Sequence, residues 1–202
     1  LHKNGTLQNL AINRTIHALQ DWRPILLQHG IDQPITVATS AVRDARNRDE
    51  FLQRVRREVG FEIEILSGQE EARRTLVGII AGLSPPVTNM LVLDIGGGST
   101  EFVFSTAGQS NQCYSIDLGV VRLTERFFTS DPIRDDEINA AQHFILKHLH
   151  LLKAKLGIMG DTTLIGTAGT ITTLAAMDQA MASYDQRTIH QCQLSLTAIQ
   201  QI

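Results

Sequence analysis

Two strand-like segments joined by three glycines constrain the fold of this chain more than any other feature. Residues 90–95 are apolar up to an aspartate, and residues 100–105 form a second strand-like run after the glycines. Because glycine has no Cβ, its backbone can take positive φ and its N–H groups can crowd toward one point. Such a concave run of donors binds phosphate oxygens. The residues of this predicted phosphate turn are Gly96, Gly97, Gly98, Ser99 and Thr100. The alternative is an ordinary hairpin with a glycine turn.

Asp94 ends the first strand beside the turn, where a hard cation such as Mg²⁺ would be held next to a phosphate. The turn lacks Gly-Lys-Ser/Thr and leads into a strand, so it is neither a Walker loop nor a dinucleotide fingerprint. A second run of small residues follows a predicted strand and opens a helix, where an anion can approach closely. Its candidate binding residues are Gly166, Thr167, Gly169 and Thr170. Tight helix packing is an equal alternative for this second run.

Helical and strand-like patterns alternate along the chain, which predicts an α/β architecture. The expected helices are 7–29, 48–59, 68–81, 120–129, 135–155 and 170–182, and the expected strands are 35–39, 62–66, 90–95, 100–105, 113–117 and 163–166. Pro24 predicts either a kink or two helices in the first of these. Asn47 and Glu50 are spaced as a capping box. The stretch 82–88 with its two prolines is the best candidate for a hinge between domains.

Composition excludes several function classes. A formal net charge of -3 gives no global signature for nucleic acid or membrane, so we expect neither partner. No apolar run approaches the roughly 18 residues of a membrane span. Cys113 and Cys192 lack metal-ligand spacing and are interpreted as free thiols in a reducing compartment, which favours a cytoplasmic location.

Several motifs together resemble one family. The run 94–101 resembles the second phosphate loop of the actin-like superfamily, and 166–170 is similar to its third glycine motif. The runs 38–51, 64–73 and 117–122 resemble the exopolyphosphatase / guanosine pentaphosphate phosphohydrolase (Ppx/GppA) family. These matches cover nearly the whole chain in the expected order.

The resemblance implies an α/β fold of two actin-like (ribonuclease H-like) lobes with a cleft between them. Residues 1–83 would form the first lobe and residues 84–202 the second. The family's first phosphate loop and its C-terminal segment have no counterpart in this sequence, so we expect both lobes to be incomplete. The resemblance also implies a homodimer.

The resemblance assigns the catalytic base to Glu71. Reasoning from the residues supports this choice over its neighbour, because Ser67 as N-cap would place Glu70 where it can cap back to the helix start. Glu71 then lies about 100° further round the helix and could orient a water. The alternative is a solvated glutamate favoured by the helix dipole.

Three further residues receive roles from the resemblance. Arg43 would bind substrate phosphate with its guanidinium fork, or would be a surface arginine. Asp94 and Glu101 would hold Mg²⁺ or another divalent cation, although a cross-strand salt bridge is almost as good an interpretation of Glu101. The eight arginines between residues 40 and 75 are balanced by eight acids, which is typical of a solvated helix face rather than a polyanion track.

The resulting expectation is a Mg²⁺-dependent phosphoanhydride hydrolase. It would release the terminal phosphate from inorganic polyphosphate or from guanosine pentaphosphate (pppGpp), by attack of a water that Glu71 places. Two alternatives stay open, namely a non-catalytic nucleotide-binding or signalling module and an ATP-dependent kinase of the same superfamily.

Overall fold

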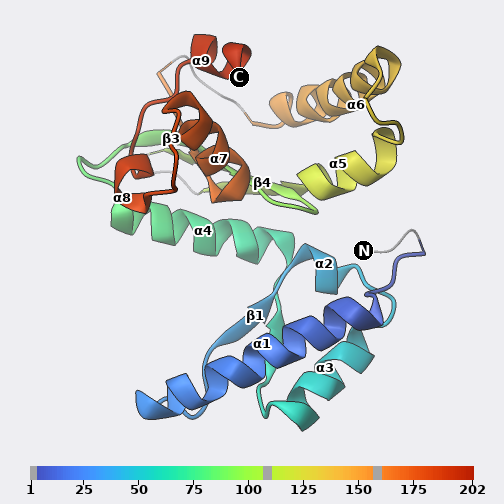
Figure 1. The fold of residues 1–202 in the computed structure, drawn as a ribbon. Helices are drawn as coiled ribbons and strands as arrows, with labels where there is room; N and C mark the ends of the chain where they lie inside the picture. The colour runs from blue at the N-terminus through green and yellow to red at the C-terminus, as the bar shows by residue number, and fades with distance from the viewer. Residues whose placement is uncertain (1–3, 107–110, 157–160) are drawn as a thin grey trace. The chain divides into compact units, whose positions relative to one another are not determined.

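The computed structural model describes residues 4–106, 111–156 and 161–202. Contacts group the chain into two compact units, Leu1–Gly68 and Gln69–Ile202, and Figure 1 labels most of their elements. This division falls earlier than the expected boundary after residue 83. The helix between the two positions packs on the strands that follow it, and it therefore groups with the second unit. Across the described ranges, no helix has both the length and the apolar character needed to cross a membrane.

The first unit packs helices on a short parallel strand pair. Its elements are α1 (Asn9–Gln28), β1 (Thr36–Ala38), α2 (Ser40–Arg43), α3 (Arg48–Glu58) and β2 (Ile63–Ile65). The core forms where apolar residues of α1 and α3 meet, with Ile16 and Val55 almost fully buried. Pro24 lies inside α1, so the predicted first helix is continuous.

The predicted capping box of α3 is wrong. Asn47 is the N-cap residue, but its side chain makes no bond to the helix. Its amide instead accepts from the Leu7 N–H at 2.8 Å and donates to the Leu7 carbonyl at 3.1 Å. A tertiary contact across 40 positions has replaced the local one.

The second unit is built on a four-stranded sheet. Its elements are α4 (Gly68–Gly82), β3 (Asn89–Ile95), β4 (Thr100–Thr106), β5 (Gln112–Ile116), α5 (Val120–Phe127), α6 (Asp135–Lys153), β6 (Thr163–Thr167), α7 (Ala168–Asp178), α8 (Gln186–Ile189) and α9 (Leu196–Gln201). The strand order is β5-β4-β3-β6. β4 is antiparallel to both neighbours, whereas β6 runs parallel to β3.

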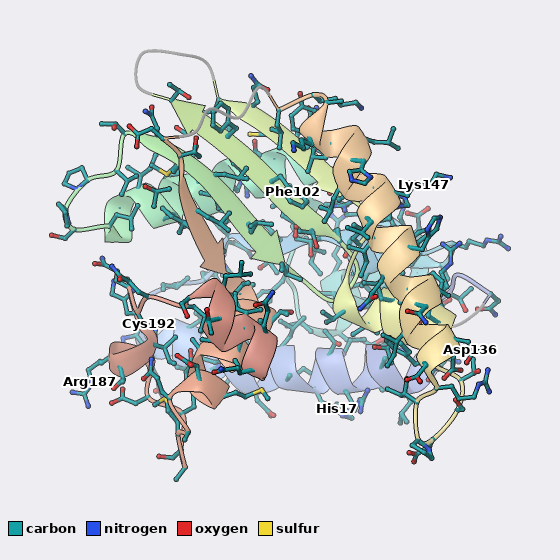
Figure 2. All side chains as sticks on the ribbon, turned by 90° about the horizontal axis from the view of Figure 1, so that it is seen from above. His17, Phe102, Asp136, Lys147, Arg187 and Cys192 are labelled. Atoms are coloured by element: carbon teal, nitrogen blue, oxygen red, sulfur yellow. The ribbon has the colours of Figure 1, made fainter. Side chains whose placement is uncertain are left out.

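Each face of this sheet is covered by a different helix. On one face, Ala72 and Leu76 of α4 pack against alternate residues of β3 and β4, including Val92, and α4 runs along these strands in Figure 1. On the other face, Phe102, labelled in Figure 2, packs with Leu152 of α6. Successive strand residues point to opposite faces. The sheet register therefore decides which side chains can meet on the α4 face.

Candidate active site

A row of polar side chains crosses all four strands of the sheet at one level. Asp94 on β3 is directly opposite Glu101 on β4 and Thr167 on β6, and Glu101 is in turn opposite Ser115 on β5. Residues paired in register project from the same face. Asp94 follows Val92 by two positions, so the whole row lies on the α4 face.

Glu101 is the buried member of this row. Its side chain is almost inaccessible, at 2% exposure, and its Oε1 accepts a hydrogen bond of 2.7 Å from the Ser115 hydroxyl. Burial raises the pKa of Glu101, and the negative charges of Glu71 and Asp94 raise it further, while hydrogen bonds from Ser115 and Ser99 oppose the shift. Among the described residues no cation pairs with this carboxylate, so the salt-bridge interpretation of Glu101 is wrong.

Helix α4 adds two side chains to the row. The Thr75 hydroxyl donates to Oδ2 of Asp94 at 3.0 Å. Glu71 precedes Thr75 by four residues and therefore lies on the same side of α4, one turn nearer the helix start. Its charge acts on Glu101. Three carboxylates, those of Glu71, Asp94 and Glu101, thus gather at this end of the sheet.

The adjacent glutamates of α4 have separate environments. Glu70 accepts hydrogen bonds of 2.8 Å from Nε and Nη2 of Arg73 and one of 2.7 Å from Nε of Arg74. These arginines lower the pKa of Glu70 to about 2. Glu70 is therefore committed to an ion-pair network, whereas the charge of Glu71 acts on Glu101.

The glycine turn is held from behind by helix α5. The first amides of α5 donate to the carbonyls of Gly96 and Gly97 at 3.0–3.1 Å, and Nε of Arg122 donates to the Gly98 carbonyl at 2.9 Å. This approach requires Gly119 at the N-cap, because a Cβ there would overlap the Gly97 carbonyl. Close approach, and not positive φ, is what this turn demands, since none of its glycines is among the described residues with positive φ.

Three N–H groups of the turn point away from α5. In a planar trans peptide the N–H is directed opposite to the preceding C=O. The carbonyls of residues 96–98 face α5, so the amides of Gly97, Gly98 and Ser99 face the other way. In the described part of the chain none of these amides donates to a protein acceptor. They form a concave donor set of the kind that binds anions.

The two hydroxyls of the turn are used inside the fold. Thr100 is buried and its Oγ1 donates to the Leu118 carbonyl, while the Ser99 side chain hydrogen-bonds Glu101. A contact of these two residues with phosphate would therefore come from the backbone.

The second glycine run shows tight packing. A Cβ at Gly166 would lie 2.7 Å from Cγ2 of Ile171, and the Thr170 hydroxyl donates to the Ile95 carbonyl at 3.0 Å. Ala168, the first residue of α7, has φ of 68°. The space around Gly169 is open within 4 Å. Packing contacts account for the small residue at Gly166 and for the hydroxyl of Thr170. Thr167, the residue paired with Asp94, is the member of this run that belongs to the polar row.

Arg43 belongs to the first unit. It is the last residue of α2, and its Nη1 donates to the Leu66 carbonyl at 2.9 Å while Nε lies 3.8 Å from Asp44. The side chain thus joins α2 to the end of β2. Its role in substrate binding stays a prediction. Most of the other arginines predicted to form a solvated face also have acidic partners within their own unit.

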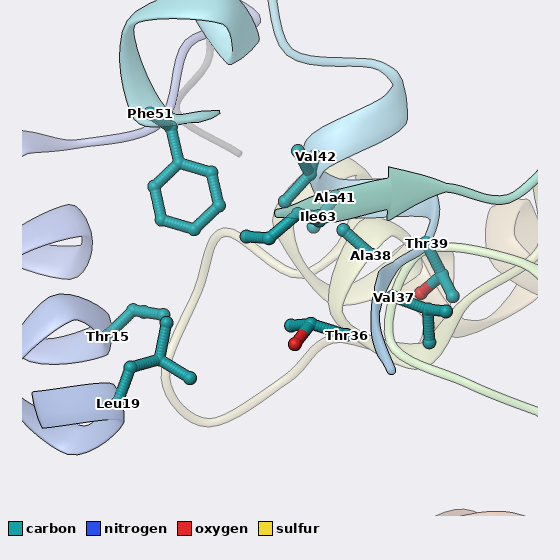
Figure 3. Close-up of a pocket in the computed structure, with 10 residues that line it drawn as sticks. All are labelled: Thr15, Leu19, Thr36, Val37, Ala38, Thr39, Ala41, Val42, Phe51 and Ile63. Atoms are coloured by element: carbon teal, nitrogen blue, oxygen red, sulfur yellow. The ribbon is translucent and has the colours of Figure 1, made fainter. Parts of the chain in front are cut away.

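A cavity of about 310 Å³ lies elsewhere, in the first unit. Figure 3 shows Leu19, Val42, Phe51 and Ile63 around it. The lining carries no ionisable side chain, so this cavity lacks the chemistry of an anion or metal site.

A divalent cation held by Asp94 and Glu101 stays a prediction. The described residues contain no group of three or more His, Cys, Asp or Glu side chains arranged as metal ligands. Mg²⁺, however, keeps several waters and is usually held by one or two carboxylates together with substrate phosphates. The buried Glu101 carboxylate has a raised pKa and is affected by the charges of Glu71 and Asp94. A cation bound there would offset this negative charge.

Known proteins resemble this chain in both sequence and structure. A sequence model of the Ppx/GppA phosphatase family matches residues 1–201. The chain belongs to the Ppx/GppA phosphatase family. Exopolyphosphatase 2 of Mycobacterium tuberculosis is 37% identical over 185 residues, which cover 89% of this chain and 58% of that relative. A bifunctional 3-dehydroquinate synthase/phosphatase of Fusobacterium nucleatum is 34% identical over 198 residues, which cover 94% of this chain and 29% of that relative.

Solved structures of the Ppx/GppA family share the fold. The Aquifex aeolicus family member has a TM-score of 0.77 at 35% identity, covering 98% of this chain and 63% of its own. An exopolyphosphatase from Cytophaga hutchinsonii has a TM-score of 0.80 at 29% identity, and the match covers 91% of this chain and 59% of that exopolyphosphatase. The predicted α/β fold of the actin-like superfamily is confirmed. This Ppx/GppA chain spans 58% of the length of the Mycobacterium tuberculosis exopolyphosphatase and 63% of the length of the Aquifex aeolicus protein.

Proposed function

We propose that the full-length protein is a Mg²⁺-dependent phosphoanhydride hydrolase that releases terminal phosphate from inorganic polyphosphate or pppGpp. The observation that carries this proposal is the meeting of three carboxylates beside an outward-facing set of backbone donors on one sheet face. Membership of the Ppx/GppA phosphatase family and the likeness to an exopolyphosphatase support it.

Each part of the site has a role in this reaction. The amides of Gly97, Gly98 and Ser99 bind oxygens of the phosphate chain. Asp94 and Glu101 would hold Mg²⁺, whose charge offsets that of the phosphates. Thr75 and Ser115 keep these two carboxylates in place through their hydroxyl hydrogen bonds.

Glu71 supplies the proton chemistry. Its carboxylate orients a water in line with the bond to be broken and accepts one of its protons. The water oxygen bonds to the terminal phosphorus, and the bond from that phosphorus to the bridging oxygen breaks. The bridging oxygen keeps the electron pair and becomes the new end of the shortened chain.

The test compares the two adjacent glutamates of α4. Phosphate release by the full-length protein is measured with Mg²⁺ on long-chain polyphosphate and on pppGpp, side by side. Glu71→Gln should lower kcat by roughly 10²- to 10⁴-fold, the usual contribution of a positioned base. Glu70→Gln makes the same chemical change one position away, in an arginine network, and should stay within about threefold of wild type.

Two outcomes would count against this proposal. If both variants retain activity, Glu71 is not the base. If the wild type binds pppGpp but releases phosphate from neither substrate, the protein is a nucleotide-binding module and not a hydrolase.

A further inference from the structure

Arg122 contacts the glycine turn on the side of its carbonyl groups. It lies in the first turn of α5, where its Nε donates to the Gly98 carbonyl at 2.9 Å and its Nη2 lies 3.6 Å from Oδ1 of Asp117. Its own backbone amide donates to the Gly97 carbonyl at 3.1 Å. One residue therefore contacts two successive peptide groups of the turn.

The three peptide groups of the turn are not held by the same means. The carbonyls of Gly96 and Gly97 accept from backbone amides at the start of α5, which every amino acid except proline would supply. The Gly98 carbonyl accepts from a side chain. The third peptide is thus held by a contact that a substitution can remove while the helix stays in place.

We propose that Arg122 is a positioning residue that aims the Ser99 N–H at the bound phosphate by fixing the Gly98 carbonyl. This inference rests on the proposed role of the turn as an anion site. Arg122 acts through the peptide group and not by contact with substrate, because the guanidinium nitrogen that bonds Gly98 lies on the carbonyl side, opposite the outward-facing amides.

Loss of the contact has a defined consequence. Gly98 carries no Cβ, so the peptide between residues 98 and 99 can rotate with little steric resistance on the Gly98 side. Rotation by about 180° replaces the N–H with a carbonyl oxygen on the face that binds the anion. A donor becomes an acceptor there, and its partial negative charge repels phosphate.

Two neutral substitutions separate this mechanism from a simple effect of charge. In Arg122→Gln the amide nitrogen occupies the same place along the side chain as Nε and can still donate to Gly98. Arg122→Met has the same length and places a methyl group there. Arg187→Met is the control for removal of one positive charge, since Arg187 projects outward at 94% exposure (Figure 2).

The measurement is calorimetric titration of the full-length protein with tripolyphosphate in the presence of Mg²⁺, with the melting temperature of each variant taken alongside. Arg122→Met should weaken binding roughly 10- to 100-fold, the range for one lost hydrogen bond to a charged group. Arg122→Gln should bind at least about threefold more tightly than Arg122→Met, and Arg187→Met should match wild type. With tripolyphosphate bound, amide exchange at Ser99 should be faster in Arg122→Met than in the wild type or in Arg187→Met.

Three results would overturn the inference. Equal weakening in the Met and Gln variants would mean that charge, and not the Gly98 contact, matters. Unchanged binding in both, or a wild type that does not bind tripolyphosphate, would remove any positioning role. A wild type that binds tripolyphosphate but releases no phosphate would contradict the hydrolase alone, because the same titration still decides the role of Arg122.

Discussion

The Thr75 hydroxyl on α4 donates a 3.0 Å hydrogen bond to Oδ2 of Asp94 on β3. This bond links the helix that carries Glu71 to the strand that carries a proposed metal ligand. It therefore couples the spacing of the proposed base and the proposed metal site to the packing of α4 on the sheet.

Thr75→Val should weaken this link. Valine has the shape of threonine without the donor, so the half-buried Asp94 loses a partner, at a cost of about 1 kcal/mol in unfolding free energy. The Mg²⁺ concentration needed for half-maximal phosphate release should rise, because Asp94 is less well oriented. Thr75→Ser keeps the hydroxyl and is the control. Indistinguishable Mg²⁺ titrations of the two variants would contradict this role.

Glu101→Gln should raise the melting temperature near pH 7–8 in EDTA while lowering activity. The amide removes a buried charge beside Glu71 and Asp94, and its oxygen can still accept from Ser115.

The raised pKa of Glu101 makes this difference in stability depend on pH. The folded state binds the proton of Glu101 more tightly than the unfolded chain does, and this favourable contribution is complete below the ordinary pKa of 4.5 and is lost as pH rises through the higher folded value. The advantage of the Gln variant should therefore appear above pH 4.5 and vanish below it, and a constant difference from pH 4 to 8 would contradict the assignment.

Mg²⁺ should stabilise the wild type in the absence of substrate. A ligand that binds only the folded state adds about 2.7 kcal/mol at 100 times its Kd. Asp94→Asn should abolish most of the resulting shift in melting temperature, as measured with and without EDTA. Asp178→Asn, on an exposed position at the end of α7, should shift like the wild type. An undiminished shift in Asp94→Asn would place the cation elsewhere.

Gly119→Ala should disable the glycine turn. The new Cβ would overlap the Gly97 carbonyl, so α5 and the turn must separate by the width of a methyl group, with a loss of roughly 1–3 kcal/mol in stability. Phosphate release should fall by more than tenfold. Gly78→Ala is the matched control, because the space around that exposed position of α4 is open and alanine should stabilise the helix by about 0.5–1 kcal/mol. Equal behaviour of the two variants would show that the close approach at Gly119 is unimportant.

Most elements of the fold could be predicted because their signals are local. Helices α3, α4 and α6 begin and end within about two residues of the expected positions, since apolar periodicity marks them and glycines lie at or near the ends of α3 and α4. Helices α2 and α8 are four residues long, which is too short to show a period.

The sequence predicts the proposed catalytic and metal-binding residues of the site better than it predicts the contacts that hold them in place. Sequence motifs point to Glu71, Asp94 and Glu101, and in the structure the charges of Glu71 and Asp94 act on Glu101. The sequence does not point to Ser115, because its place depends on the register of β5 against β4, which the alternation of residues within each strand does not fix. Gly119 and Arg122 lie in a motif that was noted without a role, since only the folded chain shows that α5 supports the glycine turn.

Helix α4 carries two kinds of side chain in alternation. Glu71 and Thr75 serve the polar row, while Ala72 and Leu76, each directly after one of them, are buried against β3 and β4. This helix therefore cannot fray without opening the sheet core. Thermal inactivation should then be an event of the whole unit, in which activity is lost together with cooperative melting and no folded but inactive population accumulates on moderate warming.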